Sequence, residues 1–145
     1  MIKNKDNSSV YFILLFLVII INSIGSTFFI TIFLSGVVFE IFIQSLERKN
    51  LYRSIFSIIC FLFIEVVLGL PLFIFSLISL FIYYILLQKI KLSFSSDILA
   101  QLTYIFIFYF LFFLIMAIIN HYDFTIYKIF IYNFILDSII IGLFV

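Results

Sequence analysis

Glu65 interrupts an apolar run that extends from residue 54 to residue 87, and Gly69 and Pro71 follow it closely. A carboxyl group in hydrocarbon costs about 3 kcal/mol on insertion scales, so it requires a partner, a wet cavity or a function. As one helix the run would be about 50 Å long, whereas the hydrocarbon core of a bilayer is about 30 Å thick. Glycine and proline favour a reversal. The run is therefore predicted to form two helices joined at Gly69–Pro71.

The composition indicates that the whole chain belongs in a membrane. Hydrophobic residues make up 67% of the 145 residues and charged residues only 10%, with a mean hydropathy of +1.43. A soluble domain of this length needs more polar surface than that, so we predict an integral membrane protein. The formal net charge of +1 argues against nucleic acid as a partner.

The same length argument divides the rest of the chain. The first apolar run begins at Val10 and is predicted to break at the polar stretch 22–27, and residues 120–123 form another polar turn. We expect a single all-α transmembrane domain over residues 1–145, a polytopic bundle of six helices. The expected helices cover residues of about 10–21, 28–45, 54–68, 71–88, 98–119 and 125–145.

The basic residues predict the orientation of this bundle. With six spans, the N-terminus, the 47–53 loop, the 89–97 loop and the C-terminus share one side. That side carries Lys3, Lys5, Arg48, Lys49, Arg53, Lys89 and Lys91. The other side carries only Lys128, so the positive-inside rule places both termini in the cytoplasm. Residues 1–27 also have the pattern of a signal peptide, which we interpret as an uncleaved signal anchor.

Four polar residues within the predicted helices are candidates for structural or partner contacts. Glu65 lies near the outer end of its helix, where it either faces the external interface or forms a buried hydrogen-bond or ion-pair node. Asp137 lies near the middle of the last helix, on the same face as Asn133. Glu40 lies about two turns inside the cytoplasmic end of the second helix. Glu40, Asn133 and Asp137 together suggest a polar seam. Two further candidates for this seam are Gln101 and Tyr104.

The expected helices offer these carboxyls no lysine or arginine as a counter-ion. The carboxyls are therefore expected to be protonated, to bond to other polar side chains, or to meet a cation of a partner subunit. One histidine and one cysteine cannot form a structural zinc, haem or iron–sulfur site, and Cys60 is expected to be a buried packing residue. No phosphate-binding loop, nucleophile elbow or catalytic triad spacing occurs. We predict no catalytic residue, no cofactor and no metal site.

The stretch from Ser57 to Leu87 resembles the central block of the bacterial rod-shape-determining MreD proteins. Members of that family typically carry an acid, a glycine a few residues later, and a Pro-Leu-Gly-like turn. Here Glu65, Gly69, Pro71 and Leu72 occupy those places. Two expected helices and a basic loop precede the block, and a basic connector and two helices follow it. The resemblance thus spans nearly the whole chain.

Outside the central block, one position agrees with the family pattern: Asn133 falls where many members place an asparagine in the final helix. Other positions differ from it. Glu65 replaces the commoner aspartate, Phe61 and Phe73 stand where glycine is frequent, and Ser138 lies near the place of an expected proline. Glycine at these positions would allow the helices to pack closely near the turn, and this chain lacks it there.

The resemblance implies a non-enzymatic subunit of the cell-elongation machinery in the bacterial inner membrane. Such a subunit would scaffold the MreC protein and the wall synthases that make peptidoglycan, and MreB indirectly. The family is also similar to the six-helix substrate-binding subunits of energy-coupling-factor transporters, which gives an alternative function. Those subunits usually have alanine-rich faces, and this chain has only Ala100 and Ala117. A small membrane assembly subunit without further specialisation is a third interpretation.

Overall fold

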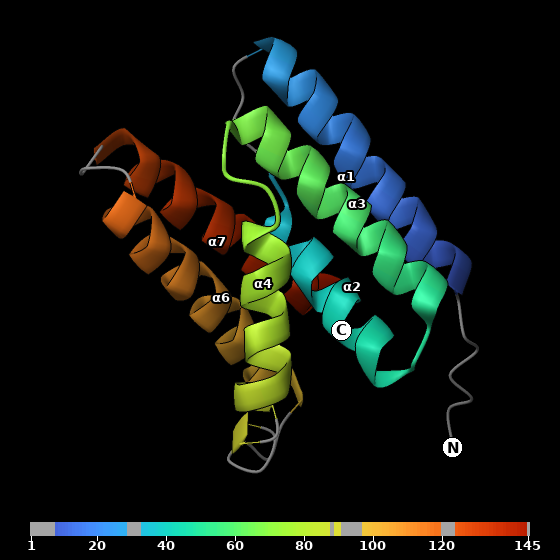
Figure 1. The fold of residues 1–145 in the computed structure, drawn as a ribbon. Coiled ribbons are helices and arrows are strands. Elements are labelled where there is room, and N and C mark those ends of the chain that lie inside the picture. Colours follow the sequence, from blue (N-terminus) through green and yellow to red (C-terminus); the bar gives the residue numbers. More distant parts are fainter. Residues whose placement is uncertain (1–7, 29–32, 88, 91–96, 120–123, 145) are drawn as a thin grey trace.

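The computed structural model describes residues 8–28, 33–87, 89–90, 97–119 and 124–144, and every regular element among them is a helix (Figure 1). The elements are α1 (Ser8–Phe28), α2 (Ser35–Glu47), α3 (Leu51–Leu68), α4 (Ile74–Phe81), the π-helix η1 (Ile82–Leu86), α6 (Asp97–Ile119) and α7 (Phe124–Phe144). The predicted all-α class is confirmed for these residues.

The short helix α2 lies at the centre of the molecule. It contacts α1, α3, α4, α6 and α7, while α1 pairs with α3 and α6 pairs with α7. Successive helices alternate in direction, so the α2–α3 turn lies at the end of the molecule where α1 begins (Figure 1). The α2 helix has only 13 residues, about 20 Å, and is therefore shorter than α1, α3, α6 and α7.

The core around α2 is aromatic. The rings of Phe39 and Phe108 are stacked with centroids 4.6 Å apart, and Phe75 and Phe112 lie 4.8 Å apart. Phe61 is fully buried and contacts the Phe75 and Phe108 rings. The large side chain of Phe61 thus joins α3 to α4 and α6.

The boundary between the first two helices differs from the prediction. A break was expected at residues 22–27, but α1 continues to Phe28, and α2 begins only at Ser35. The physical reason is that the amide of Asn22 donates to the carbonyls of Val18 and Phe33, both at 2.9 Å. The amide nitrogen of the buried asparagine thus has one acceptor within α1 and one in the segment before α2, so Asn22 does not end the helix.

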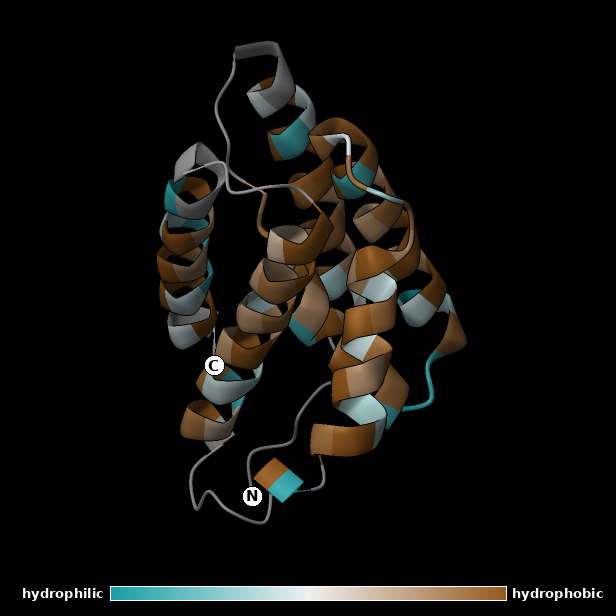
Figure 2. Ribbon diagram, turned by 60° about the vertical axis from the view of Figure 1, so that its left-hand side comes forward, coloured by the Kyte–Doolittle hydropathy of each residue, from teal (hydrophilic) through white to brown (hydrophobic). Residues whose placement is uncertain are grey.

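The helices carry apolar side chains outward as well as inward. Figure 2 shows mostly hydrophobic residues along the helices. Large apolar side chains are exposed on several helices, among them Ile13 (63%) on α1, Val66 (66%) on α3 and Ile131 (62%) on α7. A soluble monomer rarely exposes this much contiguous apolar surface.

Candidate functional site

Glu65 holds the start of α4 from the end of α3. Its Oε2 accepts a hydrogen bond from the backbone N–H of Phe73, and its Oε1 accepts one from Phe75, both at 2.7 Å. The Glu65 side chain is fully buried. Of the two placements expected for Glu65, the structure therefore shows the buried hydrogen-bond node and not the external interface.

The backbone of Glu65 takes part in the same turn. Its carbonyl accepts the N–H of Leu70 at 2.9 Å, and the N–H of Gly69 donates to Val66 at 3.1 Å. These two bonds form a Schellman motif, which needs a residue with positive φ after the helix, and Gly69 supplies it with φ 65°. Pro71 lies exposed in the following turn. We call Glu65, Gly69, Phe73 and Phe75 the Glu65 clasp.

Phe73 in this clasp also has a left-handed backbone, with φ 69°. It is the N-cap of α4, and its own side chain makes no capping bond. A bulky residue in this conformation is strained, whereas glycine is not.

Asp137 holds the start of α2 in a similar way, but from a distant part of the chain. Its Oδ2 accepts the backbone N–H of Gly36 at 2.7 Å and also accepts the hydroxyl of Tyr109. The hydroxyl groups of Tyr109 and Ser35 are 3.0 Å apart, within hydrogen-bond distance. A Cβ atom on Gly36 would lie 2.6 Å from the carboxyl oxygen, so only glycine allows this approach. We call Ser35, Gly36, Tyr109 and Asp137 the Asp137 cluster.

Asn133 extends this contact by one turn of α7. Its Oδ1 accepts the backbone N–H of Phe33 at 2.8 Å, and its Nδ2 donates to the carbonyl of Ile129. The carbonyl of Phe33 in turn accepts the amide of Asn22. Asn22, Phe33 and Asn133 therefore connect α1, the approach to α2, and α7.

The two acids perform the same task at two helix starts. The first N–H groups of a helix have no partner within it, and they carry the positive end of the helix dipole. In α2 and α4 these groups are buried, and Asp137 and Glu65 satisfy some of them. Leu34 and Phe73, the N-caps of the two helices, both have left-handed backbones. A carboxyl group at such a position is favourable by both hydrogen bonding and charge.

Glu40 lies apart from both groups, farther along α2. It is 7% exposed and accepts the amide of Gln44 at 3.1 Å. The first turn of α3 also contains a buried cation, because Arg53 is 2% exposed and lies 4.2 Å from the centroid of the Tyr11 ring. Arg53, which was expected in the 47–53 loop, is thus a buried residue of α3.

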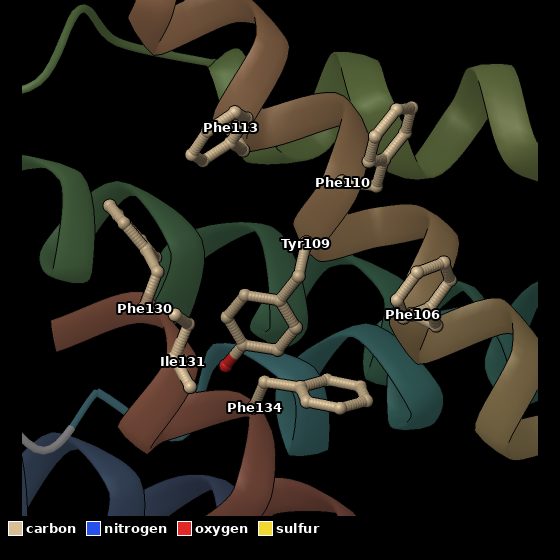
Figure 3. Close-up of a pocket in the computed structure, with 7 residues that line it drawn as sticks. All are labelled: Phe106, Tyr109, Phe110, Phe113, Phe130, Ile131 and Phe134. Atoms are coloured by element: carbon tan, nitrogen blue, oxygen red, sulfur yellow. The ribbon is translucent and has the colours of Figure 1, made fainter. Parts of the chain in front are cut away.

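An aromatic hollow of about 240 Å³ lies between α6 and α7. Figure 3 shows Tyr109 reaching from α6 toward α7. The tyrosine ring lines the hollow, and its hydroxyl belongs to the Asp137 cluster. The other lining residues are apolar: Phe106, Phe110, Phe113, Phe130, Ile131 and Phe134.

The structure joins some of the predicted seam and divides the rest. Asn133 and Asp137 act together at the start of α2, whereas Glu40 lies farther along that helix. Tyr104, expected in the seam, is instead 3.4 Å from the carbonyl of Leu87. The seam tyrosine is Tyr109.

Sequence reasoning missed Gly36, Ser35, Tyr109 and Asn22. The small pair Ser35-Gly36 within a long apolar run was the available signal for an interruption there.

Together the fold and these buried polar groups define an all-helical protein with apolar exterior faces and two acid-capped helix starts. Two described helices, Leu51–Leu68 and Ile98–Ile119, are long and apolar enough to cross a membrane, and Ser9–Gly25 and Ile74–Leu86 are shorter apolar helices. Comparison with protein-family models, curated proteins and solved structures gives no significant match.

Proposed function

We propose that the chain is a non-enzymatic, multi-pass subunit of the bacterial inner membrane that scaffolds the cell-elongation machinery. The observation that carries the proposal is the Glu65 clasp. The residues that resemble the MreD block, Glu65 and Gly69, are those that bond or turn the backbone between α3 and α4. The strained Phe73 occupies the usual glycine position of that block.

The membrane part of the proposal is supported by the buried helix starts. Bilayer hydrocarbon offers no water to a backbone N–H group, so broken helices occur there only where protein groups satisfy them. Glu65, Asp137 and Asn133 satisfy such groups at α4, at α2 and just before α2. The exposed apolar faces of α1, α3 and α7 fit contact with lipid.

The scaffold part is supported by how the buried acids are used. Glu65 and Asp137 direct their oxygens at backbone N–H groups of the chain itself, and Glu40 accepts from Gln44. Glu65 thereby fixes the start of α4 to α3, and Asp137 fixes the start of α2 to α7. A rigid bundle with an apolar exterior is suited to hold partner membrane helices, such as those of an MreC-like scaffold and the wall synthases.

Topology is tested by labelling single cysteines in a Cys60→Ser background. Lys49 and Leu72 flank α3, which at 18 residues is about 27 Å long. We expect a membrane-impermeant maleimide to label Lys49→Cys only from the cytoplasmic side and Leu72→Cys only from the outside. Labelling of both positions from the same side would contradict a span at α3.

The elongation role is tested by recovering the tagged chain in mild detergent from cells. We expect an MreC-like protein and wall synthases to co-purify, and depletion of the chain to change cell width. Recovery of an ATPase and a coupling protein, with unchanged width, would contradict the proposal in favour of a transporter subunit.

A further inference from the structure

A groove between α1 and α3 has a polar end and an apolar length. It measures about 440 Å³ and is lined by Phe12, Asn50, Tyr52, Ile55, Phe56 and Ile59. Asn50 and Tyr52 belong to the start of α3, while the remaining lining residues are apolar. The Phe12 and Phe56 rings meet edge-on with centroids 5.7 Å apart. The α1 and α3 helices lie side by side along this length (Figure 1).

The polar end of the groove is next to a basic turn. Arg48 and Lys49 directly precede Asn50, and both are exposed. Glu47 is the one acidic residue of the segment 47–50, so the formal net charge of this segment is positive. Arg53 points away from the turn's surface, since it is buried over the Tyr11 ring.

We propose that this groove binds an anionic phospholipid of the cytoplasmic leaflet, with an acyl chain along α1 and α3 and the phosphate at the α2–α3 turn. The proposal rests on the membrane location and orientation given under Proposed function. Basic residues beside a transmembrane helix attract acidic headgroups, and tyrosine prefers the headgroup level. A zwitterionic lipid offers the same chains and phosphate, but its added cation cancels the attraction of Lys49.

Asn50 supplies a direct donor for the phosphate. Its Oδ1 accepts the N–H of Arg53 at 3.3 Å as the N-cap of α3. The NH2 group of the same amide is therefore the part that donates to a phosphate oxygen. Tyr52 lines the groove three residues after Lys49 and is 82% exposed.

The chain contains no tryptophan, so a single introduced one reports on the lipid beside it. Ile59→Trp places the tryptophan in the groove, and Ile135→Trp places it on the exposed face of α7, away from the groove. The two isoleucines are matched, being 49% and 50% exposed. Quenching is measured in liposomes with brominated phosphatidylglycerol and with brominated phosphatidylcholine of the same chains, which gives the relative affinity for the two lipids at each position.

We expect the Ile59→Trp variant to prefer phosphatidylglycerol at least fivefold and the Ile135→Trp variant to show a ratio near one. Adding Lys49→Gln lowers the ratio at the groove by about fivefold, the effect of one basic residue near an anionic headgroup. Lys89→Gln, which removes an exposed cation from another part of the chain, leaves the ratio unchanged.

Equal quenching by both lipids at the groove, or equal effects of the two lysine substitutions, would overturn the lipid site and leave the membrane location intact. No quenching by either lipid at either position would overturn the membrane location and, with it, the lipid site.

Discussion

An amide replacement at the two buried acids is expected to have unequal costs, because their oxygens are used differently. In Glu65 each carboxyl oxygen accepts a backbone N–H. In Asp137 a single oxygen, Oδ2, accepts both Gly36 and Tyr109, and Oδ1 has no hydrogen-bond partner among the described residues. Glu65→Gln must therefore turn its NH2 group toward an N–H donor. Asp137→Asn can put its NH2 group where Oδ1 now lies.

The difference can be estimated from the bonds lost. Both substitutions remove the carboxyl charge and bury an NH2 group, but only Glu65→Gln also leaves a backbone N–H without its acceptor, at about 1–3 kcal/mol. For a chain of this length that corresponds to a melting temperature about 3–9 °C lower than for Asp137→Asn. Glu65→Ala removes both acceptors, so its melting temperature is expected to be lower still.

The assay uses the single, fully buried cysteine, Cys60. A maleimide dye that fluoresces on reaction with a thiol reports unfolding as the detergent-solubilised protein is heated. Glu47→Gln is the control, since it makes the same chemical change at an exposed residue. Equal melting temperatures for Glu65→Gln and Asp137→Asn would refute the assignment of acceptors on which the estimate depends.

The same melting assay checks three further expectations. Gly36→Ala should destabilise the protein by about 2 kcal/mol or more, because its Cβ would displace the carboxyl that it faces, whereas Gly142→Ala, with nothing within 4 Å, should be neutral or gain about 0.5–1 kcal/mol. A destabilising Gly142→Ala would contradict this contrast. Tyr109→Phe should lower the stability by about 1–3 kcal/mol, because it removes the buried hydrogen bonds of the hydroxyl. Tyr132→Phe makes the same change at an exposed position and should lower the stability by less than about 0.5 kcal/mol. Phe73→Gly should raise stability by about 1 kcal/mol by relieving a left-handed backbone, and a lower melting temperature would show that its half-exposed ring contributes more than the strain costs.

The sequence was sufficient for the helical class and for the turn after Glu65, because these depend on local signals. Glu65, Gly69 and Pro71 lie within a stretch of seven residues. The hydrogen bonds of Glu65 join it to residues only 8 and 10 positions later in the sequence. The polar stretch 22–27 misled the prediction, since the partner that satisfies Asn22 is the carbonyl of Phe33 in the following segment.

The start of α2 was beyond local reasoning for the opposite reason. Its partners lie in α7, at sequence separations of 100 and 101 residues. Hydropathy gave an apolar run through this region, and a Ser-Gly pair alone does not tell which distant acid will approach it. The shared face of Asn133 and Asp137 was predictable from their spacing, but the helix end that this face meets was not.

The distance in sequence between Gly36 and Asp137 also sets an order of events during synthesis. At about 5–20 residues per second, the ribosome needs roughly 5–20 s to pass from one residue to the other. During that interval the start of α2 lacks the carboxyl of Asp137, which accepts one of its N–H groups. Glu65, in contrast, precedes Phe73 and Phe75 by only 8 and 10 residues. The start of α2 therefore gains its carboxyl acceptor only after α7 has been synthesised. A chain halted before α7 leaves these N–H groups without that acceptor and is expected to be a target of the quality-control proteases of the cell.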